Sequence, residues 1–368
     1  MYLAWKELRY SKLRYSLVIG IMALVAYVVF MLSGLANGLS DGHKKAVVDW
    51  NADSIVLSSD SNKVASASVL KRSDIDRIDA SQKAGVGLFS AAIHQTGQTR
   101  DEDKSNISVF GADRSSFVVP QVIDGRAYKT ADEIIVSENL LDKGYKIGDT
   151  VNLGSDATDF TIVGVTPATT YSVVPVAYLN LDAYTSLKYG NQPFASDADE
   201  PISLVAIKGT PAQKVSINTS DADTKITALS LDTFVENLPG YSAQKLTLST
   251  MIYFLFVVVA AIIGIFMYVI TLQKTSIFGV LKAEGVSTGY LVRSIVSQSL
   301  IVGIIGVGVA FVLSYATSLG LPSAMPFTVN FAQWGLYAVI LVGVSIVGGL
   351  FSIRTVTKVD PISAIGGE

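Results

Sequence analysis

Charged residues are absent from three long apolar stretches of this 368-residue chain, and that pattern predicts its architecture. The stretches cover residues 15–40, 246–273 and 294–353. A helix that crosses a bilayer needs about 20 apolar residues, so each of the first two predicts one span. The third is too long for one span, and Pro322 and Pro326 interrupt it where a helix would lose backbone hydrogen bonds. The chain is therefore expected to cross a membrane four times.

The long polar segment between the first two spans carries the pattern of a folded domain. Short runs rich in β-branched and aromatic residues alternate with Gly, Asp, Asn and Pro turns, which is typical of strands. Ser137, followed by Leu140, Leu141 and Gly144, predicts one short capped helix. The segment is long enough for one sizeable domain or two small lobes. The strand-like runs are residues 54–57, 86–93, 107–110, 133–136, 150–153, 160–165, 176–181 and 202–207.

The predicted fold class is therefore a membrane protein with four transmembrane α-helices, one plus three, and a large mixed α/β extracellular domain inserted between spans one and two. Aromatic and basic residues alternate before the first span, which favours a cytoplasmic interfacial helix over a plain basic flank. The expected parts are the interfacial helix 1–16, first span 17–39, extracellular domain 40–248, second span 249–272, cytoplasmic loop with a coupling helix 273–293, third span 294–319, extracellular loop 320–330, fourth span 331–353 and cytoplasmic tail 354–368.

The basic residues predict the orientation. Cytoplasmic segments next to spans retain Lys and Arg, and in a four-span arrangement all such residues outside the insert fall on one side. We therefore expect a plasma-membrane protein with both termini cytoplasmic. The first apolar stretch is longer than a signal-peptide core and no A-x-A site follows it, so it is expected to be retained. The basic residues are Lys6, Arg9, Lys12, Arg14, Lys274, Lys282, Arg293, Arg354 and Lys358.

Residues for catalysis are scarce in this chain. The sequence has no GxxxxGK[ST] phosphate-binding loop, no HExxH and no GxSxG, and its only histidines are His43 and His94. With no cysteine, it has neither disulfides nor thiolate ligands. We therefore expect no enzymatic activity of its own, no catalytic residues, no bound metal and no resident cofactor. The uncharged spans also argue against proton or ion coupling.

The loop between spans two and three predicts a short amphipathic helix. Ile277, Val280, Leu281 and Glu284 share one helix face at i, i+3, i+4 and i+7, and Gly285 is placed to end the helix. From periodicity alone, this helix is either a docking surface for a partner or a simple interfacial connector.

Two segments resemble a known family. Residues 279–287, GVLKAEGVS, are similar to the G-x-L-K-A-x-G segment of MacB-like and FtsX-like ABC permeases, and 359–365, VDPISAI, resembles their D-P-x-x-A sequence. The resemblance implies a permease homodimer in the lipid bilayer with two copies of a separate ABC ATPase, and no nucleic-acid partner. It places ATPase coupling on the 275–285 helix, at Ile277, Val280, Leu281, Lys282, Glu284 and Gly285.

A narrower resemblance is to the haem-exporter (HrtB-like) branch of these permeases. It rests on MYLAWKELRYSKLRYSLVIG, LSGLANGL, YVITLQKTSIFGVLKAEGV, MPF and KVDPISAIGGE. It implies MacB-like mechanical export of haem from the membrane, with Trp50, Tyr171 and Tyr241 as haem-binding candidates. Met31 is a further candidate because it lies toward the outer end of the first span. Each could instead be a packing or interfacial residue. The alternatives are export of a peptide, lipid or antibiotic, or an FtsX-like signal transmitter that activates an extracellular partner.

Overall fold

The computed structural model describes residues 6–7, 9–98, 100–154, 158–190, 193–218, 225–322 and 325–351. Two compact units divide the chain. The membrane unit comprises residues 1–38 and 245–368, and the external unit comprises residues 39–244. The predicted cytoplasmic tail 354–368 lies outside the described residues, as do residues 1–5 and 8 of the predicted interfacial helix.

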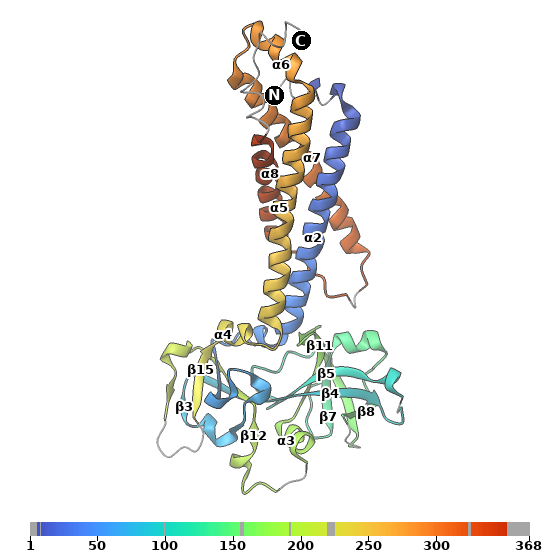
Figure 1. Cartoon of the computed structure of the whole chain (residues 1–368). Helices are drawn as coiled ribbons and strands as arrows, with labels where there is room; N and C mark the ends of the chain where they lie inside the picture. Colours follow the sequence, from blue (N-terminus) through green and yellow to red (C-terminus); the bar gives the residue numbers. More distant parts are fainter. Residues whose placement is uncertain are drawn as a thin grey trace. The chain divides into compact units, whose positions relative to one another are not determined.

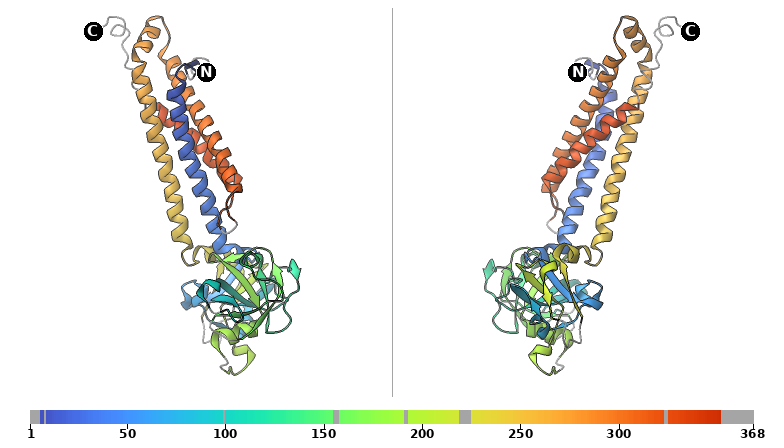
Figure 2. Two further views of the ribbon diagram at one scale, coloured as in Figure 1. Left: turned by 90° about the vertical axis from the view of Figure 1, so that its right-hand side faces the viewer. Right: turned by 90° about the vertical axis from the view of Figure 1, so that its left-hand side faces the viewer.

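Among the residues that the structure describes, four helices are long and apolar enough to cross a membrane, which agrees with the predicted number. They are α2 (Lys12–Val48), α5 (Tyr241–Gln273), α7 (Thr288–Leu319) and α8 (Phe331–Leu350). In both views of Figure 2, α2 lies next to α5 and α7. The helices α2 and α5 are longer than the spans expected from hydropathy, because each continues past its apolar stretch into residues of the external unit.

Aromatic rings and small residues hold the membrane unit together. Trp334 of α8 is fully buried against Phe30 of α2 and Phe311 of α7, with ring centroids 5.2 and 5.6 Å away. Ser345 of α8 packs on Gly303 of α7, and its hydroxyl donates to the Ser299 carbonyl at 3.2 Å. In lipid the hydrophobic effect does not drive helices together, so close van der Waals contacts of this kind stabilise the bundle.

Polar side chains join the helices at the end of the membrane unit near the N-terminus. The Tyr15 hydroxyl donates to Gln298 Oε1 at 2.6 Å, which joins α2 to α7. Lys274 Nζ lies 3.2 Å from Glu7 Oε2, and both side chains are largely buried. These four side chains thus have polar partners where water is scarce.

The predicted helix in the loop after the second span is confirmed as α6 (Thr275–Ala283). Gly285 has a positive φ of 94°, a conformation that glycine adopts without a steric cost and that ends helices. The Ser287 side chain then accepts a hydrogen bond from the Tyr290 amide and caps α7.

In its described residues, the external unit is built on one eleven-stranded mixed sheet and two small two-stranded sheets. Six strands pair in a closed ring, in the order β4–β5–β11–β7–β9–β8 and back to β4. The sheet continues from β4 through β13, β1 and β15. Figure 1 labels β4, β5, β7, β8, β11 and β15 of this sheet, with α4 (Leu231–Glu236) next to β15. The strands are β1 (Ser54–Ser58), β2 (Leu70–Lys71), β3 (Ile78–Asp79), β4 (Gln82–Gln95), β5 (Ser105–Ala112), β6 (Asp124–Gly125), β7 (Glu133–Ser137), β8 (Thr150–Leu153), β9 (Phe160–Thr166), β10 (Thr170–Tyr171), β11 (Val174–Leu179), β12 (Pro201–Ile202), β13 (Leu204–Lys208), β14 (Ser216–Ile217) and β15 (Ile226–Ser230).

Alternate residues of the strands enter two separate cores. On β5, Val109 belongs to one core and Phe110 to the other, and on β11 the same holds for Ala177 and Tyr178. Neighbouring residues enter different cores because successive side chains of a strand point to opposite faces of the sheet. The core that holds Phe110 also receives Trp50, just beyond the end of α2. Sequence order alone could not assign α2 to this core.

The predicted mixed α/β domain is confirmed, with some local differences. The short helix after Ser137 is a 3-10 helix, Glu138–Lys143, and the Ser137 side chain bonds to Asn139 instead of capping it. The helix α3 (Leu181–Tyr189) was not predicted. It packs on β4 and β5 at Gly87 and Gly111, where the Tyr184 side chain occupies the space that a Cβ would need.

Candidate functional site

An apolar groove of about 380 Å³ lies between α2 and α5 in the membrane unit. Helical periodicity brings its walls together: two residues one turn apart on α2 face two adjacent pairs one turn apart on α5. None of the lining residues is charged, so the groove suits an apolar ligand or an amphiphile's apolar part. The lining residues are Val28, Leu32, Thr250, Met251, Phe254 and Leu255.

The groove offers two chemically distinct features. Phe254, with 66% of its surface exposed, presents a ring to a ligand from the bilayer, and Met251 presents a thioether at 46% exposure. A thioether is a soft ligand that proteins use for haem iron. The groove could therefore hold a flat apolar ring system and supply one iron ligand.

The predicted candidate Met31 is half-buried on α2 and is not among the groove residues. It precedes the lining residue Leu32 and lies three positions after Val28, on the neighbouring part of the helix surface. Met251 is not among the candidates predicted from sequence, although Met251, Phe254 and Leu255 have helical spacing at the start of the second span.

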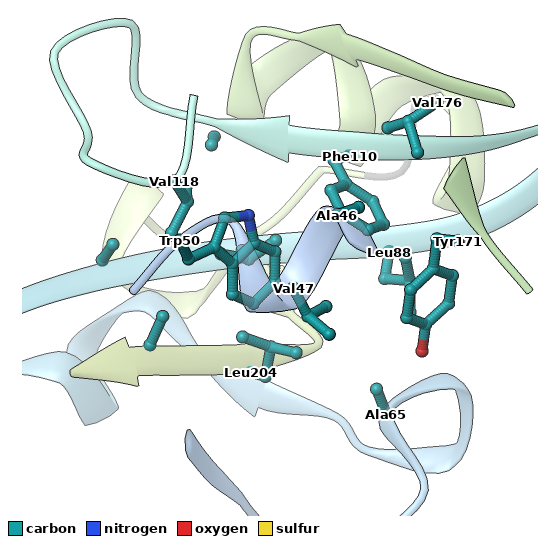
Figure 3. Packing of buried hydrophobic residues seen from close by; sticks show 14 of the residues in the cluster. Ala46, Val47, Trp50, Ala65, Leu88, Phe110, Val118, Tyr171, Val176 and Leu204 are labelled. Atoms are coloured by element: carbon teal, nitrogen blue, oxygen red, sulfur yellow. The ribbon is translucent and has the colours of Figure 1, made fainter. Parts of the chain in front are cut away.

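Two further candidates, Trp50 and Tyr171, lie in one core of the external unit. Phe110 separates them, with ring centroids 5.6 Å from Trp50 and 5.3 Å from Tyr171. Figure 3 shows Phe110 between the two rings and the Tyr171 hydroxyl directed away from it. Trp50 is 2% exposed and Tyr171 is 6% exposed, so both side chains stabilise the core in this conformation. Burial raises the pKa of the Tyr171 hydroxyl, which disfavours the tyrosinate form that binds ferric iron.

Tyr241, the last candidate, begins α5 beside the external part of α2. Its hydroxyl lies 3.1 Å from Ser40 Oγ, and its ring packs edge-on to His43 at 6.1 Å between centroids. His43 Nε2 is bonded to Gln244 Oε1 at 2.9 Å. The structure thus brings Tyr241 together with His43, and the same buried core of the external unit also contains Trp50 and Tyr171.

The helix α6 presents the features expected of a docking surface. Ile277 and Val280 are 55% and 43% exposed, while Phe278 is buried and anchors the helix to the membrane unit. Leu281 and Lys282 are half-buried, and Glu284 is exposed just beyond the last helical residue. Two neighbouring exposed apolar side chains on a short anchored helix fit a protein partner.

Within the residues that the structure describes, no group of three or more His, Asp or Glu side chains could hold a metal ion.

Four candidate spans among the described residues, an external α/β unit inserted after the first and an exposed helix after the second are the arrangement of a multi-pass membrane protein. The chain belongs to the MacB-like permease family, since the MacB-like periplasmic core domain matches residues 16–223. The FtsX-like permease C-terminal domain matches residues 249–361. Members of this class are ABC permease subunits, which work with an ATPase and are not enzymes themselves.

Relatives of known name align over the whole chain. A protein of Staphylococcus haemolyticus named as a hemin transport system permease, HrtB, is 29% identical over 100% of this chain and 99% of its own length. An uncharacterized ABC transporter permease of Mycobacterium bovis is 26% identical with the same coverage. The periplasmic region of MacB from Actinobacillus actinomycetemcomitans covers 54% of this chain at 12% identity, with a low TM-score of 0.32.

Proposed function

We propose that this chain is the permease subunit of an ATP-driven ABC efflux pump that exports haem from the membrane. The full-length similarity to the staphylococcal hemin permease is the observation that carries the choice of substrate. The uncharged groove between α2 and α5 supports the same choice, because a porphyrin must be taken up with its apolar ring against apolar side chains.

In this proposal haem enters the α2–α5 groove from the bilayer. Phe254 and Leu255 contact the porphyrin face, and Met251 contacts the iron. The carboxylates of haem stay at the polar surface, since the groove has no cation to pair with them. Trp50, Tyr171 and Tyr241 contact haem only if their surroundings open, because they are buried. Of these three, only the tyrosine hydroxyls could ligate iron.

ATP hydrolysis is proposed to occur in two separate ATPase subunits bound to the α6 helices of a permease homodimer, on the cytoplasmic side with both termini. The helix α2 continues unbroken from Lys12 to Val48, so a tilt imposed near its start reaches its other end. There the carbonyls of Gly42 and His43 accept hydrogen bonds from Val173 and Ser172. Movement of α2 would therefore move the turn between β10 and β11, next to Tyr171.

The same connection favours a second candidate function. An FtsX-like transmitter would use the bonds from α2 to the Ser172–Val173 turn to activate an extracellular partner, without transporting anything. Export of another amphiphile would use the same uncharged groove. Haem binding separates these alternatives from the proposal.

The test is a titration of the purified full-length protein with haem, in which binding is monitored by the Soret absorbance. We expect saturable binding, and we expect Met251→Leu to change the Soret maximum because the thioether ligand is lost. Met267→Leu is the matched control, since Met267 lies on the same helix but is buried. A wild-type protein that binds no porphyrin and co-purifies with an extracellular hydrolase would establish the transmitter instead. Binding with an unchanged spectrum in Met251→Leu would place the iron ligand elsewhere.

A further inference from the structure

A second groove, of about 200 Å³, lies between the same two helices toward the other end of the membrane unit. It differs from the first groove in one respect that matters for binding, since a guanidinium group lies at its polar end. Its apolar walls are a leucine of α2 and three residues of α5. The lining residues are Arg14, Leu17, Phe266, Val269, Ile270 and Gln273.

The polar end of this groove coincides with the edge of the membrane spans. Arg14 immediately precedes the charge-free stretch 15–40, and Gln273 is the last residue of the charge-free stretch 246–273. Arg14 donates a hydrogen bond from its guanidinium to Gln273 Oε1, which joins the two helices at this level. The apolar part of the groove therefore faces hydrocarbon, and Arg14 lies at the depth of the lipid head groups.

Arg14 lacks a counter-charge in the part of the chain that the structure describes: no carboxylate lies within ion-pair distance of it. Lys274, one residue beyond Gln273, is paired with Glu7 at 3.2 Å. The amide of Gln273 uses only one of the five N–H groups of a guanidinium and cannot neutralise it. A phosphate can accept two parallel hydrogen bonds from this group.

We infer that this groove is a binding site for an anionic phospholipid. The lipid phosphate accepts hydrogen bonds from Arg14, and one acyl chain packs along Leu17, Phe266 and Val269. The lining contains no His, Met or Tyr that could ligate iron, so the site favours a lipid over haem. This inference is independent of the proposed substrate.

Through this site, the lipid composition of the membrane would affect how α2 packs against α5. The first groove is formed by the same two helices, so a lipid bound near Arg14 holds in place the pair that also forms the uncharged groove.

Native mass spectrometry of the full-length protein tests the inference. The protein is incubated with an equimolar mixture of phosphatidylglycerol and phosphatidylcholine, and the retained lipids are counted. We expect wild type to prefer phosphatidylglycerol about fivefold, the contribution of one cation close to anionic lipid. Arg14→Gln should remove this preference and Arg14→Lys should keep part of it. Arg9→Gln is the matched control, since Arg9 is an exposed cation outside the groove.

A second variant covers the case in which Arg14→Gln does not fold. Val269→Trp fills the groove and leaves every charge in place, so it should lower the retention of both lipids. Equal retention of the two lipids by wild type overturns the inference. An equal loss of preference in Arg9→Gln and Arg14→Gln also overturns it, because the effect would then be diffuse electrostatics. A dimer-to-monomer shift in Arg14→Gln with unchanged lipid retention would mean that a second copy of the chain covers the groove.

Discussion

The ring of Phe327 packs directly on Gly34, in space that the Cβ of any other residue at position 34 would occupy. The backbone of Pro326 approaches Gly38, one turn further along α2, in the same way. The Thr328 amide donates to the Gly34 carbonyl at 3.0 Å. Two glycines at i and i+4 therefore let the loop between α7 and α8 contact the backbone of α2.

This contact predicts that alanine is harmful at these two glycines. Gly34→Ala and Gly38→Ala should each lower the free energy of unfolding by about 1–3 kcal/mol, because an added methyl group overpacks the contact. Gly20→Ala is the control, since Gly20 lies on the same helix with open space around its Cβ position. It should be neutral or stabilising by up to about 1 kcal/mol. Thermal unfolding in detergent measures all three, and equal midpoints would contradict the packing role.

The exposed pair on α6 predicts a loss of ATPase binding on mutation. Ile277→Asp places a charge in the apolar docking surface and should cost about 2 kcal/mol or more of binding energy, as expected of a central interface residue. Ser276→Asp adds the same charge one residue earlier, at an exposed polar position. Co-purification of the ATPase checks both variants. If Ser276→Asp and Ile277→Asp lose the ATPase alike, the apolar pair does not carry the docking.

Tyr171 can be a core residue or a haem ligand, and two substitutions separate these roles. Tyr171→Phe keeps the ring packed on Phe110 and removes only the hydroxyl, so a core role predicts unchanged haem binding. Tyr171→Ala should destabilise the external unit by about 3–5 kcal/mol, by analogy with other large-to-small aromatic substitutions. From its burial we expect Tyr171→Phe to bind haem as wild type does. A changed Soret spectrum in Tyr171→Phe would instead make the hydroxyl a ligand.

The external unit should lose some stability in acid through one ion pair. The hydrogen-bonded Arg126 guanidinium, with the Lys129 amide, lowers the pKa of Glu133 from 4.5 to about 2. A carboxyl whose pKa is lower in the folded state stabilises the fold above pH 4.5, and this contribution disappears as the pH falls toward 2. The loss should be small, because Arg126 is exposed. The unfolding midpoints of wild type and Glu133→Gln should therefore converge as the pH falls from 4.5 toward 2. A constant difference between the two midpoints over this range would contradict the role of the ion pair.

The number and type of the spanning helices could be predicted from sequence, because hydrocarbon excludes charge regardless of how the helices pack. The α6 helix and its end at Gly285 could also be predicted, because both depend on residues that are neighbours in sequence. The grooves could not be predicted, because they depend on which faces of α2 and α5 meet. The motifs around Gly34 and Phe327 were both recognised, but their contact joins positions far apart in the chain.

In the proposed function ATP hydrolysis drives haem out of the membrane, and reconstitution in proteoliposomes tests this. Proteoliposomes that contain the permease, its partner ATPase and haem are given ATP, and transfer of haem to an apo-haem protein on the external side is followed by absorbance. We expect transfer that requires ATP hydrolysis, fails with Ile277→Asp and persists with Ser276→Asp. Rapid ATP hydrolysis with all haem left in the membrane would contradict the claim.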